Sequence, residues 1–400
     1  MNVLVLSRWF PFPANTGSKI RVLNMLAQLA RRHEVALVTF GEPADLADPD
    51  RMRALRPYCA RIAAVPYRAF RPGSVRGVAG LVSLQPRSLV DTFQPAVRDA
   101  VAAEVSRGGC DVLLASQLDM APYAVAVPSV PAILEELELT TYAEAPRRAA
   151  SAARRWRARL TWLKLVGYLR RVLPRFDACT VVSEHERHHL HAVAPGYAPV
   201  HVIPNAVDLA AYSGPFGPPQ PDTLIYTGAL SYRPNYDAVA YFVSTVFPLI
   251  KSSAPNARLV VTGATEGVDL DALPRAPGVE YTGYLADIRA RLAESWLAVV
   301  PLRHGGGTRL KVLEAMALGT PVVATSKGAE GLEVTPGENI LIADDPVHFA
   351  RCVVDVLRSP EQRARLGAAG RQLVALRYDW AQVGQVLTAL VERSARRTVA

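Results

Sequence analysis

The stretch Val299–Gly331 reads VVPLRHGGGTRLKVLEAMALGTPVVATSKGAEG and decides the fold of this 400-residue chain. It begins as a short apolar strand, breaks into three glycines, and continues as a predicted helix over Thr308–Leu318 and a predicted strand over Val322–Thr325. Strand, glycine loop, helix and strand within about thirty residues make one βαβ unit. The stretch therefore predicts a parallel sheet with a loop at the carboxyl end of a strand, where such sheets bind ligands.

The glycine loop Gly305–Gly307 predicts an anion site. Glycines let a ligand approach the backbone closely, and the helix N-terminus behind them offers unpaired N–H groups with about half a positive charge. Arg309 and Lys311 add full positive charges to the predicted first turn, where a cation is unfavourable unless an anion lies beside it. Glu314 follows one turn after Lys311. We interpret the stretch as a phosphate site with a hydroxyl acceptor next to it.

Neither common phosphate fingerprint is present. Leu310 stands where G-x-G-x-x-G needs its last glycine after Gly305 and Gly307, and the spacing to Lys311 is wrong for a P-loop. The sequence His304–Gly307 (HGGG) also suggests an esterase oxyanion loop, but the chain contains no G-x-S-x-G nucleophile motif. An acyl hydrolase is therefore disfavoured.

The rest of the chain repeats the βαβ plan in two halves, separated by the proline-rich stretch Gly214–Pro221. Apolar runs and helical periodicity predict the following elements. Strands are expected at Asn2–Ser7, Val35–Phe40, Ile62–Val65, Val112–Ala115, Ala132–Glu135, Ala178–Val182, Thr223–Thr227, Arg258–Thr262, Val279–Thr282 and Leu297–Pro301, and helices at Ser18–Arg32, Asn235–Lys251, near Asp269, Asp287–Ser295, Pro346–Leu357, Pro360–Arg377 and Trp380–Arg393. Since 400 residues exceed one ordinary core, we predict two doubly wound α/β domains with a cleft between them.

Composition favours a folded cytoplasmic protein. Half of the residues are hydrophobic, which excludes a disordered chain. The four cysteines are far apart in sequence, which predicts a reducing compartment and neither a disulfide framework nor a cysteine metal site. The N-terminus lacks a signal peptide, and no apolar stretch is long enough to span a bilayer.

One segment concentrates positive charge. Residues 146–176 contain ten basic residues and no acidic one, interleaved with tryptophans and aliphatic side chains. A long helix of this composition can lie on an anionic membrane surface. The alternative is a solvated helix that packs its apolar residues on its own domain, and the sequence leaves both open.

Residues His185–His189 spell H-E-x-x-H, a zinc pattern. No third ligand stands at a recognised spacing, so we favour the start of a solvated helix and predict no metal. Aromatic residues do not alternate with basic ones on a predicted strand, so nucleic acid is not expected as a partner.

The chain resembles the GT-B glycosyltransferases of the retaining family 4, in the branch with the signature GGGTRLKxLEAMAxGxPVVxT. The matching stretches cover nearly the whole chain: Pro11–Arg21, Val181–Glu184, Ile203–Asp208, Gly228–Phe242, Gly305–Thr325, Pro336–Asn339 and Tyr378–Trp380. The resemblance implies two Rossmann-like domains, an N-terminal acceptor-side domain at 1–203 and a nucleotide-sugar domain at 204–379. It also implies that the helix at 380–400 packs back on the first domain.

The resemblance further implies transfer of a sugar from a nucleotide diphosphate sugar to a glycan or lipid-linked acceptor, without a metal or other cofactor. Glu314 would accept hydrogen bonds from the ribose, while the other donor-binding positions would be Gly17, Gly228, Gly305, Gly306, Gly307, Thr308 and Glu330. The leaving diphosphate would be stabilised by Arg309, Lys311 and Arg233. The expected product is a surface or exported polysaccharide, made by a cytoplasmic protein. Binding of 146–176 to the inner face of the membrane stays one of the two alternatives for this segment.

The sequence departs from the family pattern in three places. Gly306 replaces a glutamate that would hold the donor sugar, although the branch signature also has glycine there. Ala229 and Pro234 replace an arginine and a lysine of the loop after the first strand of the second domain. Leu137 replaces an acceptor-side histidine, which leaves the polar candidates Glu135, Glu136 and Glu138, of which we choose Glu138 as catalytic. These departures keep open a non-catalytic nucleotide-sugar-binding scaffold protein, or another GT-B enzyme such as an epimerase.

Overall fold

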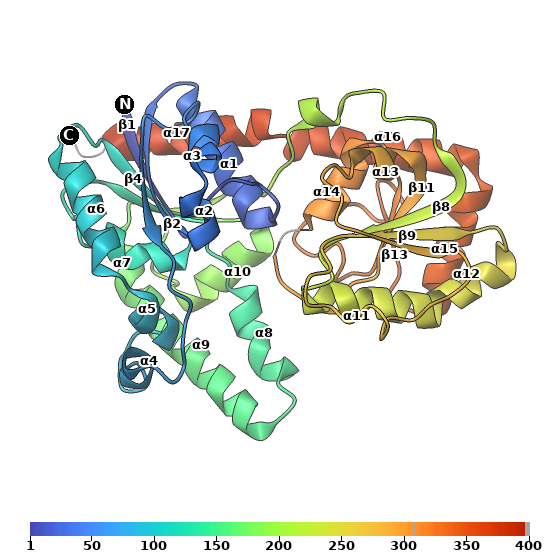
Figure 1. Cartoon of the computed structure of the whole chain (residues 1–400), viewed down its shortest axis with the longest axis horizontal. Helices are drawn as coiled ribbons and strands as arrows, with labels where there is room; N and C mark the ends of the chain where they lie inside the picture. Colours follow the sequence, from blue (N-terminus) through green and yellow to red (C-terminus); the bar gives the residue numbers. More distant parts are fainter. Residues whose placement is uncertain (308, 397–400) are drawn as a thin grey trace. The chain divides into compact units, whose positions relative to one another are not determined.

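The computed structural model describes residues 1–307 and 309–396. The chain divides into two compact units. The N-terminal unit contains Met1–Pro204 and the segment from Val383 onward, and the C-terminal unit contains Asn205–Gln382. Each unit is an α/β sandwich in which helices cover both faces of one parallel sheet (Figure 1).

The N-terminal unit is built on a parallel sheet of seven strands in the order β3-β2-β1-β4-β5-β6-β7. Its strands are β1 (Asn2–Ser7), β2 (Glu34–Gly41), β3 (Arg61–Pro66), β4 (Val112–Ser116), β5 (Ala132–Glu135), β6 (Ala178–Val181) and β7 (Val200–Val202). Val5 of β1 lies opposite Leu37 of β2 and Leu114 of β4. Nearly continuous apolar strands form because both faces of a parallel sheet are buried.

The helices of the N-terminal unit connect these strands. They are α1 (Gly17–Ala30), α2 (Pro43–Ala47), α3 (Pro49–Leu55), α4 (Val75–Ala79), α5 (Arg87–Thr92), α6 (Pro95–Ser106), η1 (Leu118–Met120), α7 (Ala121–Ala124), α8 (Thr140–Arg148), α9 (Ala152–Val172), η2 (Leu173–Arg175) and α10 (Glu184–Val193). The last helix, α17 (Trp380–Arg396), begins in the C-terminal unit and ends in the N-terminal unit. There Glu392 pairs with Arg32 of the segment after α1 at 3.3 Å.

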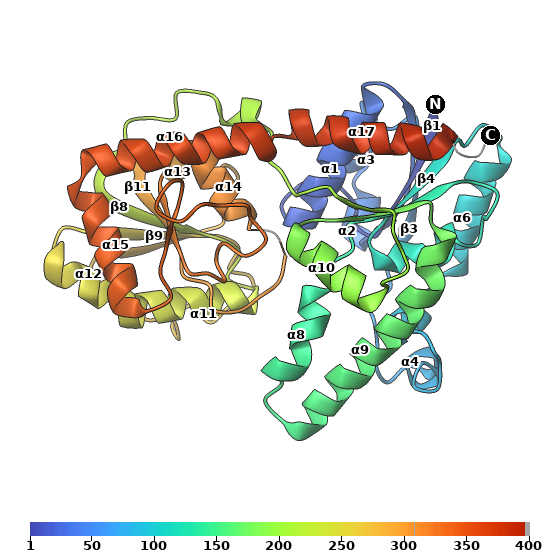
Figure 2. The ribbon, with the colours of Figure 1, turned by 180° about the vertical axis from the view of Figure 1, so that it is seen from behind.

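The C-terminal unit has a parallel sheet of six strands in the order β10-β9-β8-β11-β12-β13. Its strands are β8 (Gln220–Thr227), β9 (Arg258–Thr262), β10 (Val279–Gly283), β11 (Ser295–Val300), β12 (Val322–Ala324) and β13 (Leu341–Ile342). Its helices are η3 (Leu209–Tyr212), α11 (Arg233–Tyr241), the π-helical turn η4 (Phe242–Val246), α12 (Phe247–Ser253), α13 (Arg289–Glu294), α14 (Leu310–Ala317), α15 (Pro346–Arg358) and α16 (Pro360–Arg377), which Figure 2 shows from behind.

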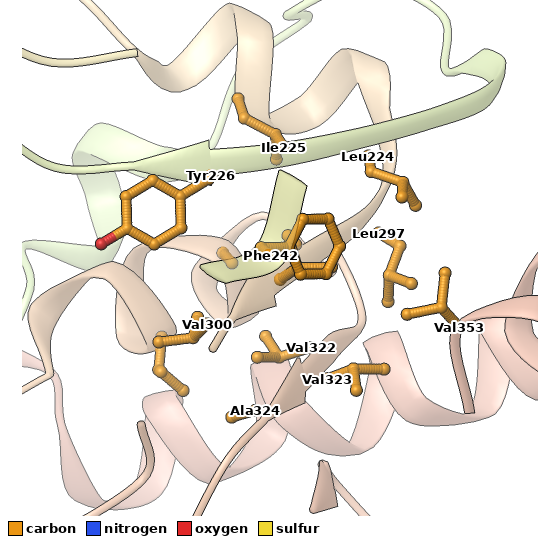
Figure 3. Packing of buried hydrophobic residues seen from close by; sticks show 14 of the residues in the cluster. Leu224, Ile225, Tyr226, Phe242, Leu297, Val300, Val322, Val323, Ala324 and Val353 are labelled. Carbon is orange, nitrogen blue, oxygen red and sulfur yellow. The ribbon is translucent and has the colours of Figure 1, made fainter. Parts of the chain in front are cut away.

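The core of the C-terminal unit lies between its sheet and the covering helices. Figure 3 shows Leu224 and Ile225 of β8, Leu297 of β11 and Val323 of β12 with Phe242 of η4 packed among them. Phe242 also makes an edge-to-face contact with Phe349 of α15, with 5.8 Å between ring centroids. Burying a side chain of this size contributes roughly 1.5–3 kcal/mol, so this layer fixes the strands that carry the site.

The two doubly wound sheets confirm the predicted α/β fold class, and most predicted elements occur within a few residues of their predicted bounds. The helix expected near Asp269 is wrong, because Leu270–Leu273 forms only a turn. The helix expected over Asn235–Lys251 is interrupted by η4. The short strands β7 and β13 were not predicted. Both lie at a sheet edge, where a few residues give no periodicity to detect.

The basic segment 146–176 is not one helix. α8 ends at Arg148, and Ser151 caps the start of α9 by accepting a hydrogen bond from the backbone N–H of Arg154. The second half of α9 buries Leu165, Tyr168, Leu169 and Val172. In the described part of the chain, no helix is both long enough and apolar enough to span a membrane.

Candidate functional site

The glycine loop lies at the point in the C-terminal sheet where the strand order reverses. It follows β11, and β11 pairs with β8, whose own loop begins at Gly228. Crevices at such switch points are where open α/β sheets bind ligands. The glycine loop lies close to the start of α11, which follows the β8 loop, because a Cβ built on Gly305 would lie only 3.0 Å from Cβ of Pro234. Gly305 also has a φ of +111°, which favours glycine.

Arg309 holds the glycine loop together. Its side chain is buried, and its guanidinium donates hydrogen bonds to the carbonyls of Gly305 (2.9 Å), Gly306 (2.8 Å) and Lys327 (3.0 Å). The residue is the N-cap of α14, which begins at Leu310. The helix therefore starts later than the predicted Thr308, and Thr308 itself lies outside the described residues. Because these donors already bind the backbone, Arg309 shapes the loop as well as charging it.

Lys311 reaches from α14 to the loop after β8. Its Nζ donates hydrogen bonds to the hydroxyl of Tyr226 at 2.9 Å and to Oδ1 of Asn235 at 3.0 Å, and it lies 4.1 Å from the Tyr226 ring centroid. Burial, and next the charge of Arg309, lower the pKa of Lys311 to about 7. Burial therefore favours the neutral amine, so that Lys311 is only partly charged at neutral pH and a bound anion would favour its charged form.

Gly228 makes this position of Lys311 feasible. A Cβ at Gly228 would lie 2.6 Å from the Lys311 Nζ and 2.8 Å from Nδ2 of Asn235, and the residue has a φ of +147°. The lysine thus occupies the space of a missing side chain. It brings a cation to the loop in which Ala229 and Pro234 carry none.

Glu314 lies on the next turn of α14 and accepts a hydrogen bond from a tyrosine of η3. The hydroxyl of Tyr212, in η3, donates to Glu314 Oε1 at 3.1 Å. Burial raises the pKa of Glu314, while the Tyr212 hydrogen bond and the charge of Lys311 oppose that shift. The bond uses one carboxylate oxygen, so the group is oriented and has acceptor capacity to spare.

The remaining predicted donor residues have different local environments. Glu330 pairs with Lys327, whose Nζ lies 2.7 Å from Glu330 Oε1. The backbone carbonyl of Lys327 accepts the hydrogen bond from Arg309 Nε. Arg233 is exposed at the first position of α11. Gly307 is exposed and has a φ of +83°. In the N-terminal unit, Gly17 is the first residue of α1, whose first turn has no acidic residue.

A second polar cluster lies in the N-terminal unit at the carboxyl ends of β4 and β5. Arg21 of α1 is buried, and its Nε donates to Glu135 Oε1 at 2.8 Å. Ser116 donates to the other oxygen of Glu135 at 2.9 Å. Arg21 also donates to the carbonyl of Ile203 at 3.0 Å. Glu135 is therefore fully engaged in holding α1, β4 and β5 together.

Glu136 differs from Glu135, because its backbone is strained. Glu136 has a φ of +58° and Gln117, which follows β4, has a φ of +70°. The Gln117 side chain donates to Glu136 Oε2 at 3.0 Å. Non-glycine residues in this conformation cluster at functional sites. Burial and then the neighbouring carboxylates of Glu135 and Glu138 raise the pKa of Glu136 to about 8, against the charge of Arg21.

Two residues of this cluster bear on the sequence-based expectations. Glu138, predicted as catalytic, is half-buried in the segment between β5 and α8. Leu137, at the position that the resemblance assigns to a histidine, is 1% exposed and belongs to the core. Glu136, its neighbour, is the carboxyl with the unusual environment.

The H-E-x-x-H motif lies on α10. The imidazoles of His185 and His189 approach within 3.2 Å of each other. Glu186 is buried and instead accepts hydrogen bonds from the backbone of Leu139 (2.6 Å) and Thr140 (3.2 Å). Within residues 1–307 and 309–396, no group of three side chains is placed to bind a metal ion. The glutamate therefore serves the fold at the start of α8.

Comparison with known proteins shows to which family the chain belongs. Residues 16–211 match the model of Glycosyltransferase Family 4, and residues 221–359 match that of Glycosyl transferases group 1. The structure of Anabaena Alr3699/HepE in complex with UDP superimposes with a TM-score of 0.70 over 98% of this chain and 100% of that one, at 12% identity. The chain belongs to the GT-B glycosyltransferases.

Curated relatives of this GT-B glycosyltransferase match over part of their length. Glycogen synthase of Mycobacterium tuberculosis is 31% identical over 219 residues, 51% of this chain and 50% of that protein. A GDP-mannose-dependent monoacylated alpha-(1-6)-phosphatidylinositol monomannoside mannosyltransferase of Corynebacterium glutamicum is 29% identical over 163 residues, 37% of this chain and 42% of that one. The matches span about half of each relative or less.

The sequence did not indicate several residues of the two clusters. Tyr212, Tyr226 and Asn235 lie on elements that precede the glycine loop's own βαβ unit, and Gln117 has no motif. The signals in the sequence were the position of Tyr226 and Gln117 at or next to the end of an apolar strand, and the place of Asn235 within the family-like stretch Gly228–Phe242.

Proposed function

We propose that this protein transfers a sugar, with retained anomeric configuration, from a nucleotide diphosphate sugar to a glycan or lipid-linked acceptor in polysaccharide synthesis. The observation that carries the proposal is the position of Lys311, whose buried ammonium lies between the Gly305–Gly307 and Gly228 loops. A buried cation with a lowered pKa at the carboxyl ends of two neighbouring strands fits an anionic ligand.

On the donor side, the diphosphate would lie against Lys311 and the glycine loop. Negative charge develops on the diphosphate as the sugar leaves, and a fixed cation in a dry site stabilises that charge strongly. Glu314, oriented by Tyr212, would accept the ribose hydroxyls. Arg309 would keep the loop in shape, with Gly17, Arg233 and Glu330 as further donor contacts. Since Lys311 supplies the positive charge, we propose that transfer needs no metal.

On the acceptor side, we propose Glu136 in place of Glu138. Its carboxyl is held by Gln117 on strained backbone, with Arg21 Nε 3.9 Å from Glu136 Oε1, and burial raises its pKa above the ordinary value, which favours the protonated form. A neutral carboxyl both donates and accepts a hydrogen bond, which suits an acceptor hydroxyl. The N-terminal unit would thus bind the acceptor, and the C-terminal unit the donor.

The test is a screen with UDP-glucose, GDP-mannose and other nucleotide sugars. Binding is measured by calorimetry, and turnover by release of the free nucleotide with and without acceptor, each in the presence and absence of a chelator. We expect binding of one donor class and chelator-insensitive turnover. If no nucleotide sugar binds, the proposed function is wrong.

A non-catalytic scaffold is the second candidate, favoured by Gly306, Ala229, Pro234 and Leu137 at positions where the family pattern has polar residues. Its signature in the same screen is binding of a nucleotide sugar without hydrolysis or transfer to any acceptor. Product anomers determined by NMR separate retention from inversion, and recovery of an altered donor sugar would identify an epimerase.

A further inference from the structure

The segment Phe70–Leu84 of the N-terminal unit displays large apolar side chains to solvent. Val82 is 90% exposed, Val75 87% and Leu84 71%, and Val78 and Leu81 are about half exposed. Soluble proteins seldom leave such side chains clustered without a function. The exposed residues lie on α4 and in the turn that follows it.

The backbone of this segment is firmly held, so the exposure is not that of a loose loop. Lys164 of α9 donates to the carbonyls of Gly80 (2.9 Å) and Leu81 (2.7 Å), and Arg171 donates to that of Leu84 (2.9 Å). From α5, Arg87 donates to the carbonyl of Gly77 at 2.8 Å. Lysine and arginine side chains of α9 and α5 thus hold the backbone of this segment, while its aliphatic side chains are exposed to solvent.

The first half of α9 continues the same kind of surface. Trp156 is 70% exposed, Leu163 is 65% exposed and Leu160 is also exposed. Four arginines stand among them with exposed side chains: Arg154, Arg155, Arg157 and Arg159. Figures 1 and 2 both show α4 beside α9, in agreement with the hydrogen bonds of Lys164.

The charge of this surface has one sign. Residues 67–90 contain Arg68, Arg71, Arg76 and Arg87 and no acidic residue, and residues 146–176 contain ten basic residues and no acidic one. A second copy of the chain is disfavoured as the occupant, because it would bring two basic surfaces together. An anionic surface of variable shape is favoured, because exposed aliphatic side chains and flexible arginines need no matched pocket.

We propose that the surface formed by residues 75–84 and 154–163, named here the apolar-basic surface, docks on an anionic lipid bilayer. Val82, Leu84, Trp156 and Leu163 would enter the headgroup boundary, and the arginines would contact anionic headgroups. Both segments contribute exposed apolar side chains, and the first half of α9 adds the dense positive charge. Docking is independent of the donor chemistry and would bring the N-terminal unit to a lipid-linked acceptor.

The experiment is flotation of the full chain with vesicles of phosphatidylcholine alone or mixed with phosphatidylglycerol. We expect binding to the anionic vesicles that weakens as salt is raised, because screening shortens the range of the charges. Replacing all four arginines Arg154, Arg155, Arg157 and Arg159 with Gln should weaken binding by roughly fivefold for each charge removed.

The apolar contribution is tested with Val82→Asp combined with Leu84→Asp, which should reduce binding at least about tenfold. The matched control combines Val347→Asp and Leu376→Asp, which change exposed aliphatic residues of the C-terminal unit and should leave flotation unchanged. The matched charge control is Arg53→Gln with Arg275→Gln, since both side chains are 73% exposed. Calorimetry with the bound nucleotide sugar checks that each variant keeps its donor site.

Three results would overturn the proposal. One is equal binding to neutral and anionic vesicles, which removes the role of the arginines. Another is normal flotation of the Val82→Asp, Leu84→Asp variant. The third is a dimer in sedimentation that these substitutions dissociate while vesicles bind none of the proteins, which would make the surface a self-association site.

Discussion

Replacement of Lys311 by Met tests whether a buried cation is kept for function at a cost in stability. One pKa unit corresponds to about 1.4 kcal/mol. The fall of the Lys311 pKa from 10.5 to about 7 therefore means that burying the charged lysine costs on the order of 3–5 kcal/mol at neutral pH. The variant loses two hydrogen bonds, which contribute about 1 kcal/mol each. Tyr226 keeps its bond to Asn235 at 2.8 Å.

We therefore expect Lys311→Met to unfold a few degrees higher at pH 7 while kcat falls by about 10²–10³-fold. The direction in which this stability difference changes with pH follows from the lowered pKa of Lys311. The cost of burying the charge is full below about pH 7 and disappears as the pH rises toward 10.5, where the unfolded lysine is also neutral. The difference in melting temperature between variant and wild type should thus shrink between pH 7 and pH 10.

The assays are differential scanning calorimetry at several pH values and single-turnover transfer with the donor found in the screen. Lys251→Met is the control, because its ammonium only caps backbone carbonyls, including that of Ala257 at 3.2 Å. That variant should lose stability and keep its turnover. A lower melting temperature for Lys311→Met together with kcat within threefold of wild type would refute the reasoning.

Three further outcomes are expected. Arg309→Ala should lower the free energy of unfolding in urea by about 2–4 kcal/mol, because three backbone carbonyls lose a charged donor; a change below about 0.5 kcal/mol contradicts this. Glu314→Gln should weaken donor binding in calorimetry about 10–100-fold, and Tyr212→Phe should weaken it much less. A larger loss of donor affinity in Tyr212→Phe than in Glu314→Gln would exclude Glu314 as the acceptor of the ribose hydrogen bonds. The kcat/KM of the wild type for the acceptor should fall above about pH 8 as Glu136 ionises, and Glu136→Gln should remove that fall. Glu136→Ala should lower kcat/KM for the acceptor about 100-fold with donor affinity unchanged. An unaltered pH profile in the Gln variant would rule out Glu136 as the acceptor-side group.

The sequence predicted the class of fold because both sheets are made of buried parallel strands. Runs such as Asn2–Ser7 and Arg258–Thr262 are apolar on both faces, and they coincide with β1 and β9. Predicted boundaries of helices and strands were wrong where the local sequence pattern was weak. The helix start at Thr308 was expected from the glycines, whereas Arg309 turns its side chain back onto the loop and delays the helix to Leu310.

The chain of Val299–Gly331 by itself determined that a glycine loop and a helix with Lys311 and Glu314 follow an apolar strand. Only the tertiary structure decided what these side chains contact. The pairing of β11 with β8 places Lys311 beside Tyr226 and Asn235, from an element far away in the sequence. The physical reason is that strand order sets which loops are neighbours, and the packing between these two loops buries the amine of Lys311, which is the largest cause of its lowered pKa. A local pattern encodes the residues of a site, and long-range packing sets their chemistry.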